Sequence, residues 1–182
     1  MTHLWDVSRR AFLKVTGLSL ILHPATAARL AGAGMTEAPA RGFEVLTQSQ
    51  VATLEAIAAQ LIPKDDDPGA REALAVRYID RVLAGQQRDR GPLYVAGLAS
   101  IDRTSIAMFK RRFTALDFES QTRVLQAIDQ GEVDRRHWPT IGSQEFFQLV
   151  WMHTLEGFYG SPEYGGNAEH ASWKMVGYPL HR

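Results

Sequence analysis

Residues 47–63, with the sequence TQSQVATLEAIAAQLIP, carry the signals for both ends and for the buried face of one helix. Thr47 followed three residues later by Gln50 is a capping box, in which each side chain accepts a hydrogen bond from the other residue's backbone N–H. Apolar side chains then recur at spacings of three and four residues, and Pro63 ends the run. The stretch therefore predicts an amphipathic α-helix.

Two further helices are expected after this one. Asp67 and Pro68 supply a cap and a first-turn proline for a helix that ends at Gly85. A third helix is expected over about residues 92–112, with an interruption near Thr104. The residues expected on the buried faces of these two helices are Leu74, Tyr78, Ile79, Val82, Leu83, Leu93, Ala96, Leu98, Ile101 and Phe109.

The C-terminal half continues in the same way. Asp117 and Gly131 bound a fourth helix, and Ser143 caps a fifth. No stretch alternates apolar and polar residues over the length of a strand, so the sequence predicts an all-α fold, a single compact bundle of about five helices. The buried faces of the last two helices are expected to contain Val124, Leu125, Ile128, Phe146, Phe147, Val150, Trp151, Thr154, Leu155 and Phe158.

The C-terminal segment, residues 159–182, has no helical period and is rich in glycine and aromatic side chains. A long irregular segment of this kind is typical of a functional loop, a docking segment or disorder, and its aromatic content argues against disorder. It is expected either to pack over its own bundle or to dock onto a partner. The residues expected at such an interface are Phe158, Tyr159, Tyr164, Gly165, Gly166, Asn167, Trp173 and Tyr178.

The composition narrows the class of protein. The chain has 182 residues, 45% of them apolar, with 20 basic and 20 acidic side chains, which suits one globular domain and not a disordered chain. The lack of a basic excess argues against nucleic-acid binding. Cysteine is absent, which excludes disulfides, thiol catalysis, zinc–thiolate sites, iron–sulfur clusters and covalently attached c-type haem in this chain.

The N-terminus resembles an export signal. Residues 8–14, SRRAFLK, match the twin-arginine pattern, and an apolar stretch and an A-x-A site at residues 25–27 follow. The apolar stretch is too short to span a membrane. The sequence thus predicts a signal peptide over residues 1–27, a flexible lead-in over 28–44 and a helical domain over 45–182, with a periplasmic location. The residues that carry the export signal are Arg9, Arg10, Phe12, Leu13 and Lys14.

No catalytic centre is evident. Dinucleotide, P-loop and nucleophile-elbow motifs are missing from the sequence. His153 and Glu156 lie three residues apart and, with His170, could ligate a metal, but a di-iron bundle needs two Glu-x-x-His helices and two further glutamates. The favoured interpretation is a polar pair that ties the C-terminal segment to the bundle.

Two stretches, residues 50–80 and the segment TLEGFYGSPEYGGNAEHASWKMVGYP at residues 154–179, resemble the gluconate 2-dehydrogenase subunit 3 family. The resemblance covers about residues 45–180, and the twin-arginine leader is typical of the same family. It implies a small subunit of a periplasmic, membrane-associated dehydrogenase. In such complexes an FAD-containing large subunit of the glucose–methanol–choline (GMC) type oxidises a sugar or sugar acid, and a cytochrome c subunit carries haem c and passes the electrons on.

The resemblance implies no catalytic residues and no cofactor for this chain. It suggests a non-catalytic subunit that helps the flavin subunit to assemble, remain stable and cross the membrane through the twin-arginine translocase. The chain would then meet the membrane only through the complex or through an uncleaved leader. Two alternatives remain open at this stage: a metal-dependent enzyme that uses His153, Glu156 and His170, and a stand-alone periplasmic scaffold.

Overall fold

The computed structural model describes residues 37–179, which form helices joined by turns. Within that range the only β structure is one isolated bridge between Pro39 and Thr47. The predicted signal peptide lies outside the described residues, as do the first part of the lead-in and the last three residues. No helix between residues 37 and 179 combines the length and the apolar character needed to cross a membrane.

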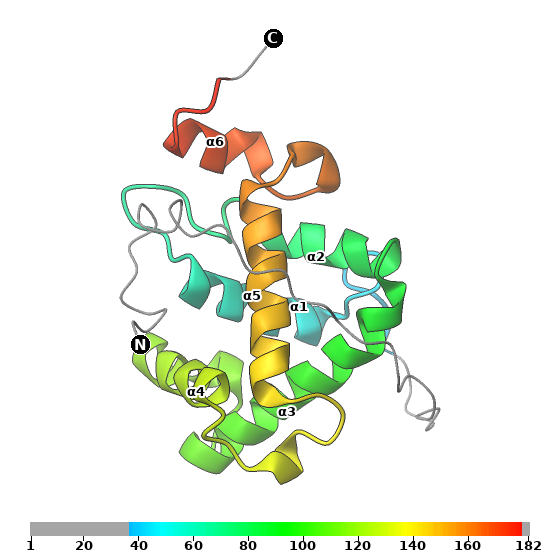
Figure 1. Ribbon diagram of the computed structural model, residues 1–182, viewed down its shortest axis with the longest axis vertical. Coiled ribbons are helices and arrows are strands. Elements are labelled where there is room, and N and C mark those ends of the chain that lie inside the picture. Colours follow the sequence, from blue (N-terminus) through cyan, green and yellow to red (C-terminus); the bar gives the residue numbers. More distant parts are fainter. Residues whose placement is uncertain (1–36, 180–182) are drawn as a thin grey trace. The chain divides into compact units, whose positions relative to one another are not determined.

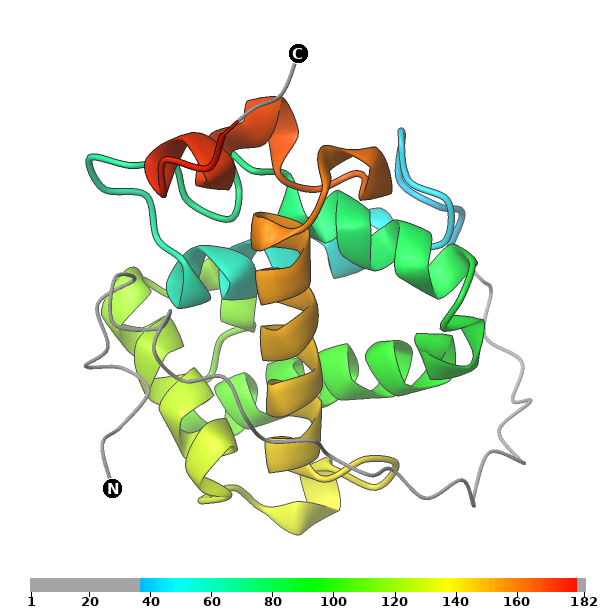
Figure 2. The same ribbon diagram turned by 45° about the horizontal axis from the view of Figure 1, so that its top comes forward.

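Helix α5 runs through the middle of the helical body (residues 48–159), and α1, α2, α3 and α4 all pack against it (Figure 1). The short helix α6 lies across the C-terminal end of α5 (Figure 2). The all-α prediction is confirmed. The bounds are α1 Gln48–Leu61, α2 Ala75–Ala84, α3 Gly91–Phe109, α4 Phe118–Gln130, α5 Ser143–Tyr159 and α6 Ala171–Met175.

The helices with local capping signals form where the sequence predicts them. At α1 the Thr47 N–H donates to Gln50 Oε1 at 2.9 Å, and the capping box is complete. At α4 the side chain of Asp117 accepts from the Ser120 N–H at 2.8 Å, and Gly131 ends the helix with a positive φ of 73°. The inward-facing residues predicted for α4 are all buried.

The predicted start of α2 is wrong by several residues. Gly69 lies against the backbone of residues 62–64, and a Cβ on Gly69 would be 2.7 Å from Ile62 O. The Ala70 N–H donates a hydrogen bond to that same carbonyl. The chain therefore turns back on itself after Pro68 instead of entering a helix. Leu74 adopts a left-handed conformation with φ 56°, which a right-handed helix cannot contain, and α2 begins only at Ala75.

Two details of α3 and α2 also differ from expectation. Helix α3 is not interrupted near Thr104, because this buried hydroxyl accepts a hydrogen bond from Trp138 Nε1 at 3.1 Å and so is satisfied inside the body. Leu74 is 41% exposed and does not join the buried face of α2.

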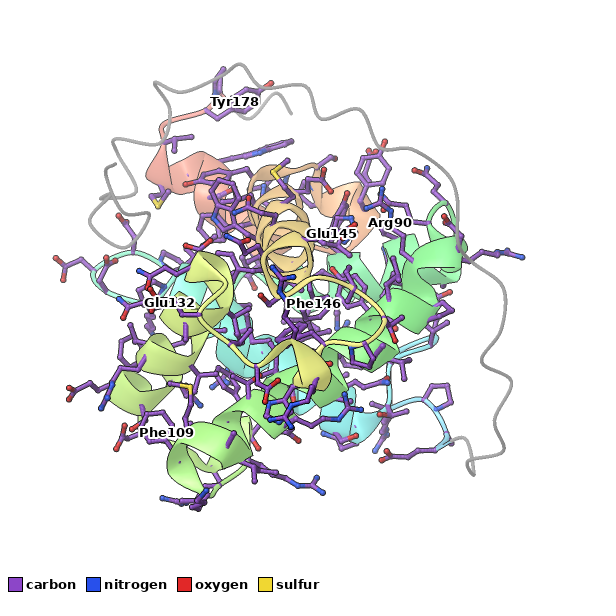
Figure 3. The ribbon with its side chains drawn as sticks, turned by 60° about the horizontal axis from the view of Figure 1, so that its bottom comes forward. Arg90, Phe109, Glu132, Glu145, Phe146 and Tyr178 are labelled. Atoms are coloured by element: carbon purple, nitrogen blue, oxygen red, sulfur yellow. The ribbon has the colours of Figure 1, made fainter. Side chains whose placement is uncertain are left out.

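The middle of the helical body is closely packed around Phe146, which Figure 3 shows near its centre. The Phe146 ring meets Tyr94 edge-on with ring centroids 5.8 Å apart. Gly97 of α3 faces the same ring so closely that any side chain there would collide with it. Phe146 and Tyr94 are both fully buried, so the packing in this region stabilises the whole body.

The N-terminal turn (residues 39–46) is held by a buried carboxylate of α2. Asp80 accepts the backbone N–H groups of Glu44, Val45 and Leu46, at distances of 2.6, 3.0 and 2.9 Å. The Ala40 N–H donates to Leu46 O at 2.8 Å and closes the turn. The expectation of a flexible lead-in up to residue 44 is therefore wrong for the part from residue 39 onward.

Candidate functional site

The sequence suggested an irregular C-terminal segment, but the tail (residues 160–179) contains short helical turns. Two 3₁₀ turns, η6 Pro162–Tyr164 and η7 Ala168–His170, lead into α6. Repeated glycines and single-turn helices leave no stretch long enough for a 3.6-residue period to show, which explains why periodicity did not detect them.

Asn167 is the residue that ties the tail to α5. Its backbone N–H donates to Gly157 O at 2.8 Å, and its Nδ2 donates to Gly160 O at 2.8 Å. Its Oδ1 accepts from both the N–H and the Oγ of Ser172, at 3.0 and 2.9 Å. Asn167 and Ser172 are fully buried, so the hydrogen bonds between them form away from water. One side chain thus links the end of α5 to the start of α6.

Glycines let three backbone segments meet at this point. A Cβ on Gly157 would lie 2.7 Å from Ala75 O, so α5 touches the start of α2 without a side chain between them. Gly166 stands so close to the Gly157 carbonyl that no side chain fits there. The Ala168 N–H donates to Ala73 O at 3.1 Å and joins the tail directly to the turn before α2.

The tail backbone is strained beside this junction. Asn167, Glu169 and His170 all have left-handed conformations, with φ of 44°, 54° and 59°. Asparagine tolerates this conformation, but it is unfavourable for Glu169 and His170, where it persists only because the surroundings impose it. The buried hydrogen bonds of Asn167 supply that restraint.

Aromatic side chains cover the outer side of the tail. Trp173 Nε1 donates to Tyr159 O at 2.8 Å, and the Trp173 ring packs on Tyr178 with centroids 4.9 Å apart. Tyr164 is 58% exposed and Tyr178 is 54% exposed. Figure 3 shows Tyr178 at the outer edge of the tail, far from Phe146. The tail therefore presents two tyrosines to solvent on an ordered frame.

The eight residues predicted for a partner interface fall into different environments. Tyr164 and Tyr178 are exposed, while Tyr159, Gly165 and Trp173 are half-buried. Phe158, Gly166 and Asn167 are buried within the chain itself and cannot form a partner surface, so the prediction is wrong for these three. Phe158 packs in the core because it lies on the face of α5 that meets the body, and the other two hold the tail in place.

His153, Glu156 and His170, the candidate metal ligands, do not converge. His153 is buried and bonds to Tyr94 of α3 and to Gln87, whereas Glu156 is exposed and accepts from the Tyr78 hydroxyl at 2.9 Å. His170 packs against the Trp173 ring in the tail. Across residues 37–179 no three histidine or acidic side chains gather closely enough to hold a metal ion.

The sequence suggested that His153 and Glu156 tie the tail to the bundle, and this interpretation is wrong. Gln87 Oε1 can only accept, so the proton of the imidazole lies on Nε2, which donates to it at 3.1 Å, and Nδ1 accepts from the Tyr94 hydroxyl at 2.8 Å. Burial, with the nearby charge of Arg90, lowers the pKa of His153 to about 4 and keeps it neutral. Burial and the hydrogen bond to Glu156 raise the pKa of Tyr78 to about 12.

Sequence reasoning missed the residues that hold the N-terminal turn and the tail in place. Gly157, Ser172 and Asp80 received no role, although each makes a buried contact that fixes one end of the described chain. A glycine inside an otherwise regular helix, such as Gly157, is a signal of close backbone approach that could have been used. The partners of Asp80 lie more than thirty residues away and leave no local pattern.

Of the three comparisons with known proteins, one found a match. The model of the family described as gluconate 2-dehydrogenase subunit 3 matches residues 48–179, from the first residue of α1 through the tail. The comparisons with curated proteins and with solved structures found no match. The match covers both stretches that carry the resemblance, residues 50–80 and 154–179. The chain belongs to the gluconate 2-dehydrogenase subunit 3 family.

Proposed function

We propose that this chain is a non-catalytic small subunit of a membrane-associated, periplasmic gluconate 2-dehydrogenase-like complex. Its role is to bind a GMC-type large subunit and to support the assembly and stability of that subunit. FAD belongs to the large subunit and haem c to a cytochrome c subunit. The observation that carries the proposal is the family match over residues 48–179, since the family is described as a subunit of that dehydrogenase.

The tail is the part of the chain best suited to dock onto the large subunit. Tyrosine is favoured at protein interfaces because it contributes a large contact area and loses little side-chain freedom on binding. Tyr164 and Tyr178 are exposed, and the backbone that carries them is fixed by Asn167. A surface ordered before binding avoids the entropy loss of ordering it during binding.

The test is co-purification of the flavin subunit with the tagged small subunit after co-expression. Replacing both Tyr164 and Tyr178 by Ala is expected to remove most of the FAD absorbance from the purified material. Phe118→Ala is the matched control, because Phe118 is 59% exposed but lies on α4, away from the tail. Full retention of FAD by the double variant would contradict docking through the tail, and absence of FAD from the unchanged pair would contradict the subunit role.

We further propose that the leader takes the large subunit through the twin-arginine translocase with it. The proposal rests on the sequence SRRAFLK at residues 8–14. Replacing Arg9 and Arg10 by Lys should leave the flavin subunit in the cytoplasm, as measured by cell fractionation and dehydrogenase activity. Arrival of active flavin subunit in the periplasm with this variant would mean that the large subunit is exported independently.

A further inference from the structure

A small surface hollow lies where the N-terminal turn, α1 and the start of α2 meet. Its volume is about 120 Å³, well below the roughly 300–1,000 Å³ typical of cofactor and small-molecule sites. An apolar cavity of about 150 Å³ can hold a benzene molecule, so this hollow suits one apolar side chain. The residues that line it are Phe43, Glu55, Ala70, Arg71, Leu74, Val76 and Arg77.

Leu74, on the rim of this hollow, is a residue that the fold does not require. Its φ of 56° would be met more easily by Gly or Asn, and its apolar side chain is 41% exposed. A leucine at this position strains the backbone and leaves apolar side-chain surface exposed to water. Strained, exposed residues are concentrated where a protein binds something. The leucine side chain extends the apolar wall formed by Ala70 and Val76, which are buried.

Arg71 and Arg77 place two positive charges beside the apolar wall. Both are exposed, and neither guanidinium makes an ion pair or hydrogen bond to another described residue. Arg77 extends along the N-terminal turn, where its Nη2 would be 3.6 Å from a Cβ built on Gly42. The one carboxylate in the lining, Glu55, forms no salt bridge with either arginine. The hollow therefore combines an apolar wall with two guanidinium groups that have no partner among residues 37–179.

The turn that carries Leu74 lies next to the tail, although no tail residue lines the hollow. The Ala168 N–H donates to Ala73 O, which places Leu74 next to η7, and Figure 2 shows the turn before α2 beside α6. The chain's own N-terminal segment is a poor electrostatic match for this site. Residues 1–36 contain four basic side chains and one acidic side chain, Asp6. Charge complementarity favours a different chain.

We propose that this hollow receives an apolar side chain of a protein partner, and that Arg71 and Arg77 bind a carboxylate next to that side chain. Arginine recognises a carboxylate through two parallel hydrogen bonds, which fix orientation as well as supply binding free energy. The carboxylate is either an Asp or Glu side chain or a free C-terminus, since both present the same chemistry. This proposal rests on the proposed function, because it names what the docking partner must present.

The test is an NMR titration of the full-length, ¹⁵N-labelled chain with three probes. Acetyl-leucine offers a terminal carboxylate, acetyl-Leu-Glu-amide offers a side-chain carboxylate, and acetyl-leucinamide offers none. At least one carboxylate probe is expected to shift the amide signals of Phe43 and residues 70–77 and to bind about tenfold more tightly than acetyl-leucinamide. Whichever carboxylate probe binds identifies the source. Equal binding of all three probes, or binding of none, would overturn the proposal.

Substitutions test the two parts of the site separately. Replacing both Arg71 and Arg77 by Gln should weaken the carboxylate probe about tenfold, whereas Arg88→Gln, at an exposed position of η3 (Arg88–Arg90), should not. Leu74→Asn should raise the melting temperature, because Asn tolerates the left-handed conformation, and weaken the probe. If Leu74→Asn stabilises the chain and binds the probe as before, the leucine has no binding role and the proposal is wrong.

Two further outcomes would also overturn the proposal. Contacts between Leu74 and residues 1–36 in the probe-free spectra would show that the chain fills the hollow itself. Shifts of the same amides with protein concentration alone would show that a second copy fills it.

Co-purification of the flavin subunit separates this inference from the proposed function. If the Arg71/Arg77 double variant retains FAD while the Tyr164/Tyr178 double variant loses it, only the hollow is excluded.

Discussion

The helical body and the tail are stabilised by different kinds of interaction. In the body, apolar side chains at helical spacing fill the interior around Phe146 and Tyr94, and buried polar side chains such as Thr104 and His153 are hydrogen-bonded among them. In the tail, the decisive contacts are backbone hydrogen bonds made by Asn167 and close approaches at Gly157 and Gly166. The body depends on the total volume that its side chains fill, whereas the tail depends on a few hydrogen-bonding atoms. A substitution in the body should therefore destabilise the whole chain, whereas a substitution in the tail should destabilise the tail alone.

The largest effect is expected from Phe146→Ala. Removing a fully buried phenylalanine should lower the free energy of unfolding by about 4 kcal/mol, because it leaves a cavity between Tyr94, Trp138 and Gly97. Urea denaturation followed by circular dichroism should show the whole chain, tail included, unfolding in one transition at lower urea. If the tail kept its hydrogen-exchange protection after the body had unfolded, the tail would be stable without the body, and this prediction would be wrong.

A pH titration is expected to act on the body through His153. The folded pKa of His153 is about 4 and its ordinary value is 6.5, so the unfolded chain binds a proton in this window that the folded chain excludes. The contribution of neutral His153 to the free energy of unfolding is fully present above about pH 6.5. It falls as the pH decreases and levels off below about pH 4, with a total loss of about 3 kcal/mol.

The measurement is the free energy of unfolding at several pH values between 7 and 4. His153→Gln should flatten the curve in this window, because the titrating group is gone. His170→Gln is the matched control, since His170 is in the tail and its side chain packs on Trp173. An equal flattening by the control substitution would place the pH dependence outside the body.

A smaller and more local effect is expected from Asn167→Ala. The substitution removes the partner of the buried Ser172 N–H and of the half-buried Gly160 carbonyl, which should cost about 2 kcal/mol. Hydrogen exchange should accelerate at residues 166–178, while α1 and α4 keep their protection. Uniform acceleration over the whole chain would show instead that the tail and the body unfold together.

The smallest effect is expected from Trp173→Phe. The phenylalanine keeps most of the ring contact with Tyr178 and loses only the hydrogen bond from Nε1 to Tyr159 O, worth about 1 kcal/mol. The exchange rate of the Tyr178 amide, which donates to Trp173 O, reports on this change. A loss as large as that for Asn167→Ala would mean that the aromatic cover, and not the buried amide, holds the tail.

The difference between the two regions also explains what the sequence could predict. The capping box of Thr47 and Gln50, and the ends of α4 at Asp117 and Gly131, depend on residues within one helical turn, and all of these were predicted correctly. The start of α2 was not, because Asp67 and Pro68 form a local signal that the contact of Gly69 with residues 62–64 overrides.

The candidate site was predictable only in part. The glycine and aromatic content of the C-terminal segment identified it as unusual, but not which of its residues are buried. Spacing placed His153 and Glu156 on neighbouring positions of one helix, yet the first turns toward α3 and the second toward α2. Spacing along a helix indicates a common side of that helix and carries no information about the element that faces each residue.

Helix α2 makes direct contacts with both ends of the described chain. Its Asp80 holds the N-terminal turn, and its Arg81 Nη1 donates to Glu163 O of the tail at 3.2 Å. The two residues are adjacent in sequence and point to opposite ends of the polypeptide. A protein that displaced this ten-residue helix on binding would thus shift the N-terminal turn and the tyrosine-bearing tail together.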